Sequence, residues 1–280
     1  MRRVGFQGLR GAYSEMAIHQ HFAGVEVVAK AYPSFEAVFM ALNEARIHDA
    51  LLPFENSLAG MIHENYDHLA RFPVTLVGEA ILQVQHCLLL PKGHKLKDVK
   101  TVLSHPQALA QCSQYLAKQG WTPRNYFDTA GAAAFLAEQP QSGFAAIASE
   151  TAAKLYGLEI AAKQIADRGH NYTRFLHLKA LRKKTSKPSI PEGPGRLFSL
   201  LLLRAGAGFG RIGPLCGILQ SLGIELVHCE ARPTKDKAWS YYYFLELAAG
   251  PEHPSWKLAL DTLTALTPSW KYLGSYRSSR

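Results

Sequence analysis

Apolar strands and amphipathic helices alternate along the first 180 residues of the chain. Residues 33–45 place Phe35, Val38 and Leu42 at helical spacing, and the apolar run D-A-L-L-P-F follows as a strand. Similar pairs of elements recur five or six times before residue 180. Strands that alternate with helices in this way predict an α/β fold with a parallel sheet.

The pattern changes after a charged, proline-bearing stretch, which we predict to be a linker over 181–194. The elements expected beyond it are strand 196–204, helix 211–222, strand 224–232, strand 239–248, helix 255–266 and strand 270–276. This βαββαβ order is that of a ferredoxin-like unit. A separate domain is therefore expected over 195–280.

The composition is that of a globular protein rather than a disordered or membrane-spanning one. Of the 280 residues, 48% are hydrophobic and 19% charged, and the length suits two or three compact units. No apolar run approaches the roughly 20 residues that a membrane span needs. The N-terminus passes from two arginines directly into V-G-F without an apolar signal region, so we expect a cytoplasmic location and no membrane partner.

The four cysteines, Cys87, Cys112, Cys216 and Cys229, lie far apart and form no C-x-x-C pair. Neither a disulfide framework nor structural zinc is expected, and we predict buried, reduced thiols. No spacing of ligand-type residues indicates a metal or another cofactor.

A net charge of +9 is the unusual feature of the composition. Five of the basic residues fall in one stretch: Lys179, Arg182, Lys183, Lys184 and Lys187. We interpret this stretch as a solvated linker, because no aromatic residues interleave with the lysines as a nucleic-acid site would require. The remaining positive charge would help to attract a small anionic substrate.

Polar residues follow the apolar strands, where open α/β sheets place their ligands. The stretch G-L-R-G-A-Y-S-E at 8–15 predicts a glycine-rich turn that leads into a helix capped by Ser14. Backbone amides near Gly11 are candidates for holding a negative charge, and a simple tight turn is an equal alternative.

Glu55, Asn56 and Ser57 directly follow the strand D-A-L-L-P-F. Asn56 and Ser57 offer neutral hydrogen-bond donors, and Glu55 offers an acid or a base. The alternative is a structural turn that caps the next helix.

The stretch S-H-P-Q predicts another helix start close to a strand end. Ser104 is expected to cap this helix, which begins near Pro106 because the missing N–H of proline costs little there. His105 and Gln107 crowd the entry, and Gln111 lies one turn further on.

The segment I-A-D-R-G-H-N-Y-T-R-F-L at 165–176 gathers Asn171, Thr173 and Arg174 at the start of an extended run. In a strand, Thr173 and Phe175 share one face and Arg174 points to the other. Such groups suit an anionic ligand whose leaving oxygen must be hydrogen bonded, and a surface loop that enters a core strand is the alternative. His86 interrupts an apolar strand at 77–90, where a core histidine is the alternative to a ligand.

Four motifs together resemble those of the prephenate dehydratase family, including the plant-type arogenate dehydratases. They are G-L-R-G-A-Y-S-E at 8–15, P-F-E-N-S-L-A-G at 53–60, L-S-H-P-Q-A-L-A-Q-C at 103–112 and N-Y-T-R-F at 171–175. The resemblance covers essentially the whole chain. It implies an α/β catalytic domain with two lobes arranged like a periplasmic binding protein, the active site in the cleft, and a C-terminal ACT domain of the ferredoxin-like βαββαβ type.

The resemblance places domain boundaries on the chain. The catalytic domain is expected over 1–180, with lobe one at 1–76 plus 165–180 and lobe two at 77–164. No chorismate mutase segment precedes Val4, so a bifunctional form is not expected.

The resemblance, taken with the positions above, also assigns roles to residues. Thr173 matches the hydroxyl that the family uses in catalysis. The other residues expected to act in catalysis are Arg174, Asn56, Glu55, Ser104 and Gln111. Those expected to bind the substrate are Gly11, Ala12, Tyr13, Ser14, Ser57, His86, His105, Gln107, Asn171 and Phe175.

The family is feedback-inhibited by phenylalanine, which its ACT domains bind at subunit interfaces. Effector contacts are expected at Glu230, Ala231, Arg232 and Pro233, where the family reads E-S-R-P, and at Gly213, Pro214 and Leu215, where it reads G-A-L. The departures from those motifs leave the identity of the effector open. Apolar and aromatic strands, such as that at 241–244, predict a homodimer or homotetramer.

Prephenate, the substrate that the resemblance implies, loses carbon dioxide and hydroxide as its ring becomes aromatic. We expect Thr173 to donate a hydrogen bond or a proton to the leaving hydroxyl, and Arg174 to hold a carboxylate or polarise Thr173. Because a threonine hydroxyl does not ionise near neutral pH, Glu55 or a relayed water is the alternative proton source. The alternatives for the whole chain are an enzyme that acts on arogenate and a non-catalytic amino-acid sensor.

Overall fold

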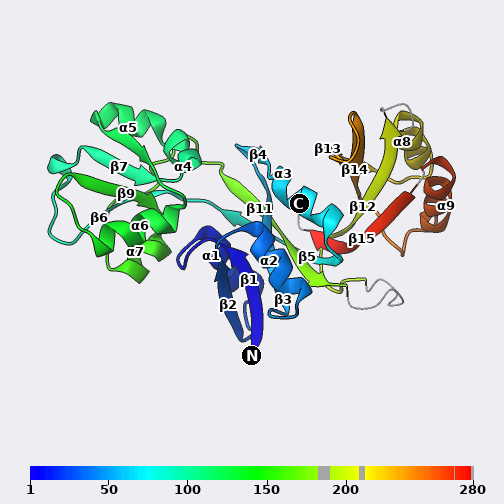
Figure 1. Cartoon of the computed structure of the whole chain (residues 1–280), viewed down its shortest axis with the longest axis horizontal. Helices are drawn as coiled ribbons and strands as arrows, with labels where there is room; N and C mark the ends of the chain where they lie inside the picture. The colour runs from blue at the N-terminus through cyan, green and yellow to red at the C-terminus, as the bar shows by residue number, and fades with distance from the viewer. Residues whose placement is uncertain (182–189, 208–211, 268, 279–280) are drawn as a thin grey trace.

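The computed structural model describes residues 1–181, 190–207, 212–267 and 269–278, and it arranges them as three bodies in a row (Figure 1). The first lobe lies in the middle, with the second lobe on one side and the C-terminal unit on the other. Of the described helices, none is both long and apolar enough to cross a membrane.

The first lobe is built on the strand order β5-β11-β3-β1-β2. Its strands are β1 (Arg2–Gln7), β2 (Val27–Tyr32), β3 (Asp49–Asn56), β5 (Val74–Gln83) and β11 (Tyr172–Ala180), with the short β4 (Gly60–Met61) paired to β3. Its helices are α1 (Tyr13–His21), α2 (Phe35–Asn43) and α3 (His63–Arg71). β3 shows how alternation builds the lobe, because Leu51 packs with α1 on one face while Leu52 packs with α2 and α3 on the other.

The second lobe is a smaller sheet in the order β10-β6-β9-β7-β8. Its strands are β6 (Cys87–Leu90), β7 (Thr101–Ser104), β8 (Thr122–Asn125), β9 (Phe144–Ala148) and β10 (Glu159–Ala162). Its helices are η1 (Leu96–Asp98), α4 (Pro106–Gln111), α5 (Ser113–Gln119), α6 (Thr129–Glu138) and α7 (Glu150–Tyr156). Buried residues of α4 and α5 pack on one face of the sheet, and those of α6 and α7 pack on the other.

Two segments cross between the lobes, and both correct an expectation. The apolar run at 77–90, expected as one strand, is two strands in different sheets, with a crossing at 84–86. The proposed lobe boundary at 76/77 is therefore wrong, because all of β5 belongs to the first sheet. The parallel sheet is correct only in part, since β11, which follows the second crossing, runs antiparallel to both β3 and β5.

The C-terminal unit has the predicted ferredoxin-like order. Its elements are β12 (Arg196–Ala207), α8 (Ile212–Ser221), β13 (Leu226–Pro233), β14 (Ser240–Leu247), α9 (Trp256–Leu266) and β15 (Ser269–Ser278). The strands run β13-β14-β12-β15, with antiparallel neighbours. Both helices cover one face, through a core that includes Leu215 and Leu263. Residues 182–189 of the expected linker lie outside the described residues.

The open face of the C-terminal sheet is packed directly against the first lobe, so the two units are less separate than the sequence suggested. One hydrophobic core contains Tyr66 of α3 and Phe244 of β14, whose rings meet edge to face at 5.1 Å. β15 also pairs with β5 where Gly274 faces Leu76. A Cβ on Gly274 would lie 2.3 Å from the Leu76 carbonyl oxygen, so this junction of the two sheets requires glycine.

The cysteine environments agree only in part with the prediction of buried thiols. Cys87 and Cys112 are buried, but Cys229 is exposed. It lies on β13, an edge strand of the large sheet.

Candidate active site

A cavity of about 210 Å³ opens where the two lobes meet. The first lobe lines it with Asn56, Thr173 and Phe175, and the second lobe lines it with His105 and Gln111. Thr173 and Phe175 therefore share the cavity face of β11, as strand alternation predicted. The cavity continues into an outer one of about 470 Å³ that shares Tyr13, Ser14, Phe35, Ile62, His105, Gln107 and Thr129 with it.

The hydroxyl of Thr173 is held by an amide. The Nδ2 of Asn56 donates to Thr173 Oγ1 over 3.0 Å and to Asn171 Oδ1 over 2.8 Å. Asn56 Oδ1 is in turn occupied by the amides of Leu58 and Ala59, at 3.1 and 2.9 Å. Because Asn56 uses a lone pair of Thr173 Oγ1, the hydroxyl proton is directed elsewhere, and Thr173 borders the cavity. The geometry suits donation from Thr173 to a bound oxygen.

The same network continues into the second lobe. Asn171 Nδ2 donates to Gln111 Oε1 over 2.8 Å, and His86 Nε2 lies 2.9 Å from the same oxygen. Burial lowers the pKa of His86, and because Gln111 Oε1 can only accept, the neutral ring carries its proton on Nε2. Its Nδ1 lies 2.9 Å from the hydroxyl of Tyr13, which donates to the carbonyl of Gln85 over 2.8 Å. The network thus joins both crossing segments to α4 beside the hydroxyl of Thr173.

Several helices begin at the two cavities. The first turns of α1, α2, α3 and α6 contribute Ser14, Phe35, Glu64 and Thr129. Helix N-termini favour negative charge, and neither cavity is lined by Lys or Arg among the residues that the structure describes. The site can therefore bind carboxylates mainly through amides, hydroxyls and helix dipoles.

Arg174 points away from the cavity. Its Nε lies 2.5 Å from Glu79 Oε1, and its Nη2 is hydrogen bonded to Glu246 and to the hydroxyl of Tyr276 in the C-terminal unit. Burial would lower the pKa of Arg174, but the carboxylates of Glu246 and Glu79 outweigh it and the pKa is raised. The expected role of Arg174 on a substrate carboxylate is wrong for this arrangement, because adjacent strand residues face opposite sides.

Glu55 is displaced for the same reason. It precedes Asn56 on β3, so its side chain turns to the Arg174 side, where Oε2 lies 3.6 Å from Arg174 Nη1. Glu55 does not line either cavity, and this argues against its use as the proton source.

Ser104 is a structural residue rather than a catalytic one. Its buried Oγ donates to the carbonyl of Ile147 over 2.6 Å. The cap expected from Ser104 is supplied by His105, whose Nδ1 accepts from the amide of Gln107 over 3.2 Å. Burial lowers the pKa of His105, so the imidazole that lines the cavity is also neutral.

The N-terminal glycine-rich turn binds protein groups at Gly11. Its amide donates to Glu15 Oε2 over 2.6 Å, and its carbonyl accepts from Ser149 Oγ over 2.9 Å, so Gly11 joins the lobes instead of presenting its amide to a ligand. Ala12, Tyr13 and Ser14 do line the cavities, but Ser14 lies inside the first turn of α1 and is not its cap.

Ser57 and Asn171 support the site from behind. Ser57 Oγ donates to the carbonyl of His170 at 3.0 Å and accepts from the amide of Tyr172 at 2.9 Å. Asn171 is buried and reaches the cavity only through Asn56 and Gln111. These two motif residues therefore support the cavity wall through hydrogen bonds and do not line the cavity themselves.

Sequence reasoning missed other lining residues. Phe35 was expected on the apolar face of its helix, and no role was predicted for Ile62, Glu64 or Thr129. For Thr129 and Glu64 a signal was available, because each is a polar residue at the start of a helix, as Asn56 and His105 are polar residues at strand ends. Among the described residues, no group of His, Cys, Asp or Glu could hold a metal ion.

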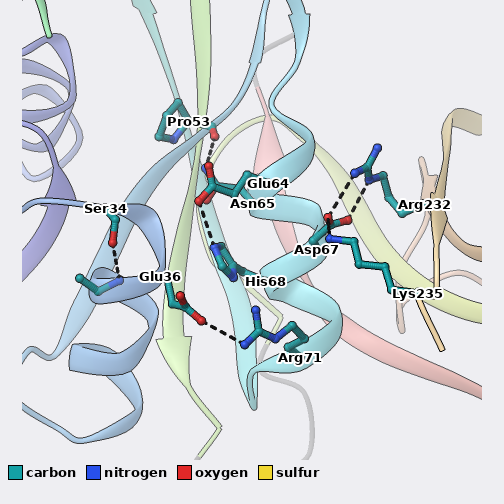
Figure 2. Close-up of polar contacts among 11 residues, drawn as sticks. Ser34, Glu36, Pro53, Glu64, Asn65, Asp67, His68, Arg71, Arg232 and Lys235 are labelled. Atoms are coloured by element: carbon teal, nitrogen blue, oxygen red, sulfur yellow. Dashed lines mark hydrogen bonds and ion pairs between the residues drawn. The ribbon is translucent and has the colours of Figure 1, made fainter. Parts of the chain in front are cut away.

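Two of the residues expected to bind an effector, Arg232 and Glu230, contact α3 of the same chain, and Figure 2 shows the contact of Arg232. Arg232 Nε and Nη2 lie 2.8 and 3.2 Å from the carboxylate of Asp67 on α3, and Lys235 joins it at 2.9 Å. Burial raises the pKa of Asp67, but hydrogen bonds from Arg232 and Lys235 leave it lowered. Glu230 faces His63 of the same helix at 3.3 Å.

The other expected effector residues have mixed positions. Ala231 and Pro233 lie on the same edge strand, β13, as Arg232. Gly213 and Pro214 are exposed in the first turn of α8, whereas Leu215 is fully buried in the core beneath the helices. A direct contact of Leu215 with an effector is therefore not expected.

Similarity to known proteins extends over the whole chain. The family model for prephenate dehydratase matches residues 4–183. The arogenate dehydratase/prephenate dehydratase 2 of Arabidopsis thaliana, described as chloroplastic, is 38% identical over 98% of this chain and 72% of that protein. A bifunctional N-acyl-homoserine lactone acylase/prephenate dehydratase of Komagataeibacter europaeus is 33% identical over 99% of this chain and 96% of that protein. The crystal structure of prephenate dehydratase from Arthrobacter aurescens in complex with L-Phe shares the fold, with a TM-score of 0.88 at 22% identity over 99% of this chain and 90% of that one.

Proposed function

The chain belongs to the prephenate dehydratase family, and on that premise we propose that it converts prephenate to phenylpyruvate in the biosynthesis of phenylalanine. The observation that carries the proposal is the hydroxyl of Thr173, which accepts from Asn56 and faces the cavity between the lobes. That position lets the hydroxyl donate to the oxygen that leaves the ring.

The reaction breaks two bonds and uses one proton. The bond from the ring carbon to its carboxylate breaks, its electron pair enters the ring, and the carbon–oxygen bond at the opposite ring position breaks. Carbon dioxide, phenylpyruvate and hydroxide result, and the hydroxide takes up one proton to become water. Aromaticity supplies the driving force, so the enzyme has to stabilise the departing oxygen and fix the carboxylates.

The described residues divide this work. Thr173 stabilises the leaving oxygen, and a donor of this kind typically lowers a barrier by about 3–4 kcal/mol. Because Glu55 lies outside the cavity and His86 is held neutral by burial, a water molecule in the cleft is the proton source that we favour. Ser14, Gln107 and the helix N-termini hold the carboxylates.

Purified protein should therefore produce phenylpyruvate from prephenate, which is followed by its absorbance. A folded, concentrated preparation that leaves both prephenate and arogenate unchanged would contradict the proposal and favour a non-catalytic amino-acid sensor. Arogenate, which would yield phenylalanine directly, is the alternative substrate, as the name of the Arabidopsis relative suggests.

A second candidate function is hydrolysis of N-acyl-homoserine lactones. The relative from Komagataeibacter europaeus, whose name includes this activity, matches the chain over nearly its whole length. The apolar walls of the cavity, at Phe35, Ile62 and Phe175, are compatible with an acyl chain. His86 is bonded to Tyr13 and Gln111 rather than to a serine, threonine or cysteine nucleophile, so the geometry favours the first function. Release of free homoserine lactone from an acylated substrate would establish the second activity.

The C-terminal unit is the proposed regulatory domain. We propose that phenylalanine binds it and inhibits the enzyme, as the L-Phe complex of the Arthrobacter protein suggests, and that the chain forms a homodimer or homotetramer in the cytoplasm. No binding heat and unchanged activity at millimolar phenylalanine would contradict the first statement. A monomeric mass by light scattering at micromolar concentration would contradict the second.

A further inference from the structure

The two connected cavities differ in the charges on their walls. The inner cavity, which contains Thr173, has no acidic residue among its described lining. The outer cavity adds two, Asp128 and Glu64. A ligand that extends from Thr173 through the shared part of the cleft would therefore meet negative charge at its far end.

Asp128 is already occupied. It is buried as the cap of α6, where Oδ1 accepts from the amide of Gly131 at 3.0 Å and Oδ2 accepts from the amide of Leu9 at 2.9 Å. Both of its oxygens therefore have backbone donors. Glu64 is the carboxylate that remains available to a ligand.

Glu64 is the second residue of α3 and has a side chain that is 58% exposed. The buried His68 lies one turn below it, with Nε2 at 3.4 Å from Glu64 Oε1 (Figure 2). Ile62, two residues before Glu64, lines both cavities, so the start of α3 forms part of the cleft wall. This places an exposed carboxylate on the outer wall.

The two alternative substrates differ at the end that would reach this wall. With the leaving hydroxyl at Thr173, the side chain on the opposite ring carbon can extend past the shared residues into the outer cavity. That side chain ends in a keto acid in prephenate and in an ammonium and a carboxylate in arogenate. Two carboxylates give prephenate a charge of −2, and the ammonium reduces the charge of arogenate to −1.

We propose that Glu64 receives the ammonium group of arogenate and so raises the preference of the enzyme for arogenate over prephenate. This inference rests on the proposed function. A carboxylate beside an ammonium is attractive, whereas beside the keto acid of prephenate it adds repulsion in a cleft without lysine or arginine on its described walls.

The test compares Glu64→Gln with a matched control, Glu36→Gln. Glu36 is likewise the second residue of its helix, α2, and is exposed, but it pairs with Arg71 at 3.0 Å and does not line either cavity. The kcat/KM of each variant is measured on arogenate and on prephenate, with thermal unfolding to verify the fold. Glu64→Gln should lower the arogenate-to-prephenate ratio by about tenfold, and Glu36→Gln should leave it unchanged.

Glu64→Asp keeps the charge and should restore most of the ratio. A ratio that stays within twofold of the wild type in Glu64→Gln, or that changes as much in Glu36→Gln, would overturn the role of Glu64 while the proposed function stands. Wild-type protein that acts on neither substrate would contradict the proposed function itself.

Discussion

The two faces of β11 have opposite chemical character. On one face, the hydroxyl of Thr173 accepts from the neutral amide of Asn56, and Thr173 borders the cleft. On the other face, Arg174 lies among carboxylates and the hydroxyl of Tyr276, where the first lobe meets the C-terminal unit. Two consecutive residues of the strand therefore serve different purposes: Thr173 lies at the proposed reaction site, and Arg174 lies at the contact between the domains.

This difference shows that membership of a motif does not imply membership of an active site. N-Y-T-R-F is one continuous motif, but the pleat of the strand sends Thr173 and Arg174 to different places. The ion pairs of Arg174 hold β11 in place, and this fixes the position of Thr173 at the cleft. The two faces should therefore respond differently to substitution.

The largest effect is expected from Arg174→Met, measured as thermal and urea unfolding. Removing the guanidinium breaks the buried ion pairs with Glu79 and Glu246, which should cost about 3–5 kcal/mol of unfolding free energy. The control is Arg71→Met, which breaks an exposed pair with Glu36 and should cost about 0–1 kcal/mol. Equal losses in the two variants would contradict the assigned structural role of Arg174.

Thr173→Val should reduce kcat with little change in stability. The substitution keeps the shape of the side chain but removes the donor, so kcat on prephenate should fall by about 10²–10³-fold. Thr173→Ser, which keeps the hydroxyl, is the matched control and should retain far more activity. Similar rates for Val and Ser would remove the hydroxyl from the mechanism.

A smaller effect should appear at mildly acidic pH, from the far end of the Thr173 face. His177 Nδ1 lies 3.1 Å from His21 Nε2, and its own Nε2 lies 2.8 Å from Asp49. Burial, followed by the charge of His177, lowers the pKa of His21 to about 4, and burial also lowers the pKa of His177.

These histidines are neutral when folded and bind protons when unfolded, so their contribution is complete above pH 6.5 and is lost as the pH falls towards 4. The melting temperature should fall over that window by several degrees. His21→Gln should flatten the dependence, and an unchanged profile in that variant would contradict this account.

The smallest effect is expected from Asp67→Asn, at the second contact between the domains. Loss of the partly exposed pair with Arg232 should cost about 1 kcal/mol or less. If phenylalanine uses Arg232, the variant should bind it severalfold more tightly by calorimetry, because Asp67 no longer competes. Inhibition should become weaker at a given occupancy, because one of the contacts between α3 and β13 is lost. Asp236→Asn, which breaks the exposed pair with Arg204 inside the C-terminal unit, should change neither property.

Local patterns predicted the parts of the site that depend on local geometry. Strand alternation separated Thr173 from Arg174, and the start of the S-H-P-Q helix placed His105 and Gln107 at the cleft. Alternation along β3 likewise separates Glu55 from Asn56, although Glu55 was predicted to act in catalysis. The structural roles of Ser104 and Gly11 could not be predicted from their own segments, because their hydrogen-bond partners, Ile147 and Ser149, are distant in sequence.

By itself, the sequence determined the α/β class, the βαββαβ order of the C-terminal unit and the face on which Thr173 lies, because each follows from periodicity within one element. Only the tertiary structure decided that β5 and β6 belong to different sheets, that Arg174 joins the C-terminal unit, and that Glu64 borders the same cleft as Thr173. These features depend on which distant surfaces pack together. That packing is selected by the burial of apolar surface and the pairing of charges over the whole chain, so a pattern within one segment cannot predict it.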